Sequence, residues 1–92
     1  MLDHVDFTLT YDSEADGTMS GSLEEIGISA NAPDLKSLKD TLADYLLEYV
    51  EDYMSQFNRY FLSSNRRAHF PYIMKAIAQT DRNALTALFK HA

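Results

Sequence analysis

Five carboxylates in the middle of this sequence could bind a basic partner or act as acid–base catalysts. Asp40, Asp44, Glu48 and Asp52 recur every four residues, with Glu51 beside them. On a helix this spacing sets like charges side by side, at a cost of about 0.2–0.5 kcal/mol per pair. The stripe is either a solvated helix face or a surface for a basic partner, which would relieve the repulsion. Catalysis fits poorly, because a solvent-facing carboxylate lacks the burial that raises a catalytic pKa.

Aromatic side chains are concentrated on the same stretch. At helical spacing such residues usually form core, but tyrosine is also enriched at protein interfaces. We therefore expect Tyr49 and Tyr53 to anchor a partner. The six residues concerned are Tyr45, Tyr49, Tyr53, Phe57, Tyr60 and Phe61.

Basic residues gather in NRRAHFPY, residues 65–72. Arg66 and Arg67 follow the predicted end of a long helix, where cations suit the free carbonyl groups. The alternative is a recognition loop for carboxylate or phosphate, which the planar guanidinium binds well. In that interpretation His69 and Tyr72 also contact the partner. The loop could instead meet the acidic helix of a second copy in a homodimer.

Charge is divided unevenly along the chain, whose formal net charge is −6. Residues 1–54 hold 13 of the 14 acids and two lysines, a net −11, whereas residues 55–92 hold six bases and one acid, a net +5. The two halves can attract each other within one fold, or each can meet a partner of opposite sign. The acidic surplus makes nucleic acid an unlikely partner for this chain by itself, because phosphate contacts need clustered Lys and Arg.

The sequence predicts no cofactor, no metal site and no enzyme. His4, His69 and His91 lack both helical i, i+4 spacing and a metal-binding motif. No phosphate-binding glycine loop or nucleophile-elbow serine is present, and there is no cysteine for disulfides or thiolate ligands.

Length and composition favour one domain over residues 1–92, with 46% hydrophobic and 24% charged residues. The segment MLDHVDFTLT lacks the basic and apolar regions of a secretory signal. No stretch approaches the roughly 20 apolar residues that span a bilayer. We expect a cytoplasmic protein without membrane contact.

Alternating apolar residues predict the strands. Residues 4–11 place Val5, Phe7, Leu9 and Tyr11 on one side, as in a half-buried strand. A turn over residues 12–17 leads to a second strand at about 18–23, and a third follows at about 26–30. The result is a three-stranded antiparallel meander, or a long hairpin if Glu24 and Glu25 form only a bulge.

The remaining chain predicts helices. Pro33 and Asp34 suit a helix start, and apolar residues then recur every three or four positions to Phe61, a span of roughly 28 residues. Residues 63–67 predict a loop. A second helix is expected over residues 71–79, and a third, capped by Thr80 or Asp81, with Leu85, Leu88 and Phe89 on its apolar face. The predicted fold is α+β: a three-stranded antiparallel sheet packed on one long amphipathic helix, followed by a C-terminal helical hairpin.

The layout of these segments resembles a known family. A small sheet, then PDLKSLKDTLADYLLEYVEDY, then NRRAHFPYIMKAI and a short last helix are similar to small bacterial antitoxins of the RelE/RelB toxin–antitoxin class. Residues 4–54 also resemble the HicB-like arrangement of a meander leading into an acidic helix. The resemblance implies a binding protein that blocks a small basic ribonuclease of the RelE type by direct contact.

The expected function is therefore that of an antitoxin-like binding protein, and the alternative is a non-catalytic homodimeric scaffold. The expected partner-binding residues come from the acidic stripe, its tyrosines and the basic segment: Asp40, Asp44, Glu48, Tyr49, Glu51, Asp52, Tyr53, Arg66, Arg67, His69 and Tyr72.

Overall fold

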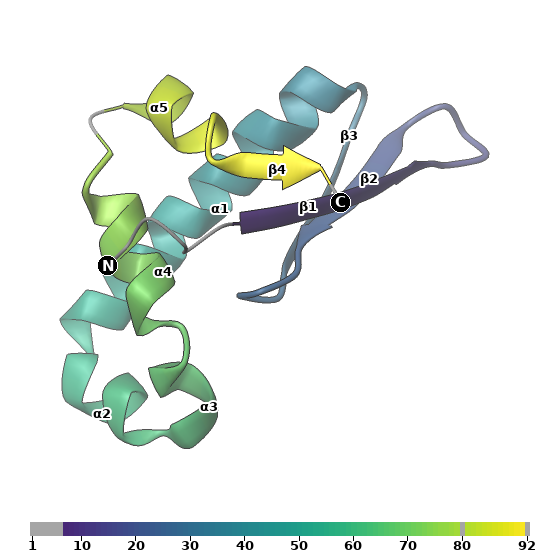
Figure 1. Cartoon of the computed structure of the whole chain (residues 1–92). Helices are drawn as coiled ribbons and strands as arrows, with labels where there is room; N and C mark the ends of the chain where they lie inside the picture. Colours follow the sequence, from purple (N-terminus) through teal and green to yellow (C-terminus); the bar gives the residue numbers. More distant parts are fainter. Residues whose placement is uncertain (1–6, 80, 92) are drawn as a thin grey trace.

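Four strands form one mixed sheet in the order β3-β2-β1-β4 in the computed structural model, which describes residues 7–79 and 81–91 (Figure 1). Strands β1 and β2 pair antiparallel with Leu9 opposite Leu23, and β2 and β3 do so with Gly21 opposite Ala30. The predicted meander is thus present, although residues 4–6 of its first strand lie outside the described residues. The strands are β1 Phe7–Ser13, β2 Met19–Leu23, β3 Ile28–Ala32 and β4 Phe89–His91.

The fourth strand corrects the predicted sheet of three antiparallel strands. β4 runs parallel to β1, with Phe7 opposite Phe89 (Figure 1). Phe89 was predicted on the apolar face of a helix, but its ring packs edge-on against the ring of Phe7, 5.9 Å away between centroids. A strand of three residues is too short to show a period of two, so packing against β1 decides its conformation.

The long helix is shorter than predicted. Helix α1, Leu35–Ser55, begins close to the expected place, but Pro33, expected at the first helical position, lies before it, and Asp34, expected in the first turn, is its cap. The Asp34 carboxylate accepts a hydrogen bond of 2.8 Å from the Ser37 amide. The helix ends at Gln56, whose φ of −123° and ψ of 41° are not helical, and α2, Phe57–Leu62, continues in a new direction. The change in direction lets the aromatic residues of α2 pack on Tyr53 and on Phe70. A straight helix would have carried them beyond the sheet.

Three short helices replace the predicted loop and helical hairpin. Residues 64–67, expected as part of a loop, form α3, Ser64–Arg67. Helix α4, Phe70–Ile77, has Pro71 in its first turn, as predicted. Helix α5, Arg82–Thr86, begins at Asp81, which accepts a hydrogen bond from the Ala84 amide, and it ends before the predicted apolar face is complete. Thr80, the alternative cap, lies outside the described residues.

The core lies between one face of the sheet and the helices. Phe7, Leu9 and Leu23 of the sheet are fully buried, as are Leu38 and Leu46 of α1. The opposite face carries hydroxyl and amide side chains that bond to one another, such as Ser22 with Ser29 at 2.8 Å. Helices α2 and α3 form one end of the molecule (Figure 1), and none of the described helices is long and apolar enough to cross a bilayer. The fold thus leaves the outer face of α1 open for a partner.

Candidate functional site

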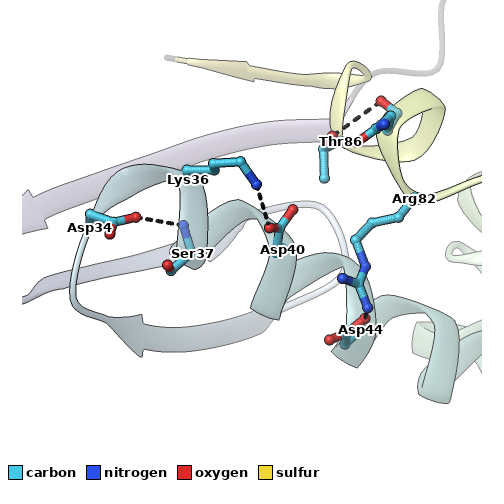
Figure 2. Close-up of polar contacts among 8 residues, drawn as sticks. Asp34, Lys36, Ser37, Asp40, Asp44, Arg82 and Thr86 are labelled. Carbon is cyan, nitrogen blue, oxygen red and sulfur yellow. Dashed lines mark hydrogen bonds and ion pairs between the residues drawn. The ribbon is translucent and has the colours of Figure 1, made fainter.

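The first half of the acidic stripe is paired within the chain. Figure 2 shows Lys36 reaching Asp40 on α1, with Nζ and Oδ2 3.1 Å apart, and Arg82 of α5 reaching Asp44. The Arg82 and Asp44 side chains are about half exposed, and their charged atoms lie 2.5 Å apart. These two carboxylates therefore have cations beside them already, and the second pair joins the middle of α1 to α5.

The second half of the stripe keeps its negative charge. Glu48 and Glu51 are exposed and have no hydrogen-bond or ion-pair partner among the described residues. Asp52 accepts hydrogen bonds from the Tyr60 hydroxyl and from Gln56 Nε2, and the first of these raises the pKa of Tyr60. With Ser55, the three acids line a shallow concavity of about 370 Å³.

The position of these three acids is electrostatically unfavourable. They occupy the last two turns of α1, and the last turn of this helix carries no basic residue. The carbonyl end of a helix has a partial negative charge that acts on the last turn, so it opposes Asp52, whereas Glu48 and Glu51 are repelled chiefly by the neighbouring carboxylates. Hydrogen bonds from Tyr60 and Gln56 offset the repulsion at Asp52, whereas Glu48 and Glu51 have no such partner among the described residues. A local rule broken without compensation, as at these two glutamates, is typical of a functional surface.

Beside this acidic end, Tyr49 joins the basic segment to α1 through a hydrogen-bonded chain. Arg66 Nη1 donates to the Tyr49 hydroxyl at 3.1 Å, and that hydroxyl lies 2.7 Å from His69 Nδ1. Either atom can donate in this second bond, because the hydroxyl can accept twice and the imidazole proton can lie on Nδ1 or Nε2.

The two arginines are also held by aromatic rings. The guanidinium carbon of Arg66 lies 5.5 Å from the ring centroid of Tyr49 and 5.6 Å from that of Tyr60. Arg67 lies over Phe61, and its Nε donates to the Phe61 carbonyl at 2.7 Å. That carbonyl is near the end of α2, so Arg67 has the local role of satisfying a helix C-terminus.

A concavity of about 440 Å³ separates this network from the turn between β2 and β3. Tyr49, Arg66 and His69 form one wall, and Glu24 and Glu25 stand on the other. Glu25 accepts hydrogen bonds from the amide and hydroxyl of Thr8, whereas Glu24 is exposed and its carboxylate has no partner among the described residues. The two glutamates were absent from the predicted site, because nothing local in the sequence links this turn to residues 49–69.

The predicted site residues thus fall into four groups. Glu48, Glu51, Asp52, Tyr49, Arg66 and His69 lie together near the end of α1, whereas Asp40 and Asp44 lie in its first half, beside Lys36 and Arg82. Tyr53 is fully buried and Tyr72 packs edge-on against Phe7 at 5.5 Å. Arg67 is exposed and turned to Phe61. Tyr45, which is 44% exposed, was not among the predicted contacts.

The environment of His69 predicts a pH-dependent stability. Burial, with the nearby Arg66 charge as a second cause, lowers the pKa of His69 below its usual 6.5. Below pH 6.5 the unfolded chain therefore binds a proton at His69 more readily than the folded chain does. The free energy of unfolding should fall as the pH drops from 6.5 toward the lowered pKa. Above pH 6.5 this contribution is constant. Urea unfolding of the wild type and of His69→Gln at a series of pH values measures it.

In that experiment the His69→Gln variant should lose the part of the pH dependence that lies just below pH 6.5. Acids with lowered pKa, such as Asp34, whose carboxylate accepts from the Ser37 amide, act at lower pH and remain in both proteins. Glu24, which faces the same concavity, is present in both proteins and therefore does not distinguish them. Equal slopes for the two proteins in this range would contradict the prediction.

Comparison with known proteins agrees with the fold and with the resemblance seen in the sequence. Residues 1–90 match the model of the PHD-like family, described as antitoxin of toxin–antitoxin, RelE/RelB, TA system. A crystal structure from Syntrophomonas wolfei subsp. wolfei, described as an antitoxin part of a proposed toxin/antitoxin system, has a TM-score of 0.89 and 24% identity. At that identity the likeness concerns the fold. No curated protein matches the sequence.

The match to the Syntrophomonas protein covers 99% of this chain and 65% of the other, so the present chain spans less than two thirds of that protein's length. The family match extends over nearly all of the present sequence, and it confirms the resemblance to the RelE/RelB antitoxin class. The chain belongs to the PHD-like family of antitoxins from RelE/RelB toxin–antitoxin systems.

Proposed function

We propose that this chain neutralises a small basic ribonuclease toxin of the RelE type by direct protein–protein contact. The observation that carries the proposal is the acidic end of α1, where Glu48, Glu51 and Asp52 repel one another and the carboxylates of Glu48 and Glu51 have no cation beside them among the described residues. A basic surface placed there would relieve this repulsion. Membership of an antitoxin family supports the same reading.

The proposed contact surface is narrower than the full stripe. It consists of Glu48, Glu51 and Asp52, with the ring of Tyr49 and the acidic turn at Glu24 beside it. Asp40 and Asp44 contribute less, since Lys36 and Arg82 already offset their charge. The proposed role is binding without catalysis, and electrostatic complementarity of this kind chiefly raises the association rate and the selectivity for basic partners.

Two double variants of equal charge test the proposal. Glu48→Gln/Glu51→Gln removes two exposed carboxylates from the proposed surface, and Asp12→Asn/Glu14→Gln removes two exposed ones at the far end of the β1–β2 hairpin. Binding is measured by calorimetry against a purified basic ribonuclease of the RelE type from the same source, together with inhibition of its messenger RNA cleavage.

We expect the first variant to raise the Kd about 10- to 100-fold and the second to change it by less than about threefold. Raising the salt concentration should weaken the wild type more than the first variant, because fewer charges remain to be screened. Equal losses in the two variants would mean that net charge alone matters, and would refute the assigned surface. A chain that binds no basic protein and associates only with itself would favour the scaffold alternative.

A further inference from the structure

Exposed apolar side chains border the acidic end of α1. Leu47 and Met54 are each 43% exposed, and the buried Val50 lies between them in the sequence. Because residues three and four apart are neighbours on a helix, these side chains form one continuous apolar edge about 10 Å long. Glu51 follows Leu47 by four residues and precedes Met54 by three, so it adjoins both. Single exposed apolar residues are ordinary, whereas a contiguous row beside charged groups is typical of a binding surface.

Helix α4 passes the second half of α1 in the opposite chain direction (Figure 1). The ring of its first residue, Phe70, lies 6.4 Å from that of Tyr53 between centroids, and Arg82, just beyond α4, reaches Asp44. Ile77, which is 47% exposed, lies between these two attachments and so comes to the level of the apolar edge of α1. The exposed apolar side chains of the two helices make up an apolar face, which consists of Leu47, Met54, Met74 and Ile77.

Charge limits what can cover the apolar face. Glu48 and Glu51 are exposed along its border. A second copy that presented the same face would set these carboxylates against their own counterparts, and an anionic membrane surface would repel them too. The arginines of the basic segment are already held by aromatic rings within the chain, so a second copy would have to break those contacts to offer them. Charge complementarity therefore favours a different, basic protein.

The segment of that protein that lies on the apolar face should be helical. The surfaces of α1 and α4 offer side chains, because their backbone groups are bonded within the helices. An extended segment placed there would leave its amides and carbonyls without partners once water is excluded. A helix satisfies its own backbone, and its side chains recur at the same spacing as Leu47, Glu51 and Met54.

We propose that the apolar face and the acidic end of α1 together bind one amphipathic helix of the basic toxin. Apolar side chains of that helix cover Leu47, Met54 and Ile77. Its lysines or arginines, on the neighbouring side of the same helix, meet Glu48 and Glu51. The inference rests on the proposed function, and it adds the secondary structure and the side-chain pattern of the partner's docking segment.

The first test removes apolar surface and keeps both glutamates. Leu47→Gln/Met54→Gln is titrated by calorimetry with a purified basic ribonuclease of the RelE type from the same source. We expect the Kd to rise about 10- to 100-fold, because two apolar side chains no longer gain from burial. This loss should persist at high salt, whereas the loss caused by Glu48→Gln/Glu51→Gln should shrink. Leu62→Gln is the matched control, since Leu62 is 73% exposed on α2, outside the apolar face, and it should change the Kd by less than about threefold.

The outcomes separate this inference from the proposed function. If Leu47→Gln/Met54→Gln binds like the wild type while Glu48→Gln/Glu51→Gln binds more weakly, the helix docking is refuted and the acidic surface stands. A wild type that binds no such ribonuclease would overturn both. An equal loss in Leu62→Gln would also refute the assigned face. So would self-association of the wild type that the first variant abolishes, because a second copy would then be the occupant.

Methionine oxidation provides a second test, which needs no substitution and stays decisive if the variant does not fold. Met54 and Met74 belong to the apolar face, whereas Met19 lies on β2 and serves as the internal control. Hydrogen peroxide transfers one oxygen atom to an accessible thioether, giving the sulfoxide and water. With the ribonuclease bound, we expect mass spectrometry to show several-fold slower oxidation of Met54 and Met74 and no change at Met19. Equal rates at Met54 with and without the ribonuclease would overturn the proposal.

Discussion

Replacing Tyr53 with alanine is expected to lower the free energy of unfolding by about 3–5 kcal/mol. The side chain is fully buried, and burial is the main reason that the pKa of its hydroxyl is raised. Its ring packs at 5.5–6.4 Å between centroids against four neighbours, on α1, α2 and α4. A domain of this size has a total stability of about 5–15 kcal/mol, so one substitution would remove a large part of it.

The reason for so large an effect is that the Tyr53 side chain contacts several segments at once. Its hydroxyl donates to the Arg66 carbonyl at 3.0 Å and so ties α1 to α3. Without the ring, Phe57 and Tyr60 lose the surface on which α2 turns back. Tyr53→Phe is the matched control, since it keeps the ring and loses only the hydrogen bond, worth about 1 kcal/mol. Urea unfolding measures both. Equal losses would show that the hydroxyl, and not packing, holds this end together.

The second large effect is expected at Gly21, in the middle of β2. A methyl group there would lie 2.8 Å from Leu38 Cδ2 and 2.9 Å from the Thr10 carbonyl oxygen. Leu38 is fully buried and the Thr10 oxygen belongs to the backbone of β1, so neither can move away freely. Gly21→Ala should therefore destabilise the protein by about 1–3 kcal/mol. In an ordinary strand interior the same change would be stabilising, because glycine loses the most backbone entropy on folding.

A neighbouring position supplies the control for Gly21. Ser22 lies on the open face of the sheet, where its hydroxyl meets that of Ser29, and Ser22→Ala should change stability by at most about 0.5 kcal/mol. Thermal unfolding of the two variants compares an added methyl on the packed face with a removed hydroxyl on the open face. If Gly21→Ala were as stable as the wild type, α1 would have to pack more loosely on β2 than the contact at Leu38 implies.

Local signals explain which parts of this fold could be predicted from the sequence. Asp81 caps its helix as one of the two expected residues, and Asp34 marks the expected start of α1, although as its cap and not inside its first turn. The alternation in residues 7–11 likewise identified β1. The break at Gln56 left no such signal: it involves neither glycine nor proline, and the aromatic spacing continues through Phe57 and Phe61 in either arrangement. Only the packing of these rings on Phe70 distinguishes a bent helix from a straight one.

The candidate site, too, could be predicted from the sequence only where it depends on local spacing. The repulsion among Glu48, Glu51 and Asp52 is visible in the sequence, because it depends on helical spacing alone. The pairing of Asp44 with Arg82 is not, since 38 residues separate the two. That pairing narrows the candidate binding surface, because it confines the unbalanced negative charge to one end of α1. The tyrosine–histidine–arginine chain also needs the fold, since it joins α1 to residues 66 and 69 across two changes of direction.

The parallel pairing of β4 with β1 also affects how the protein is made. The ribosome delivers β1 before β4, with the five helices of the described residues between them, at about 5–20 residues per second. For several seconds a newborn chain therefore holds Phe7 and the outer edge of β1 without the strand that covers them. During that interval the unpaired edge of β1 is accessible to chaperones, to proteases or to a neighbouring copy translated from the same messenger RNA. Its vulnerability is thus set by the rate of translation as well as by the stability of the finished fold.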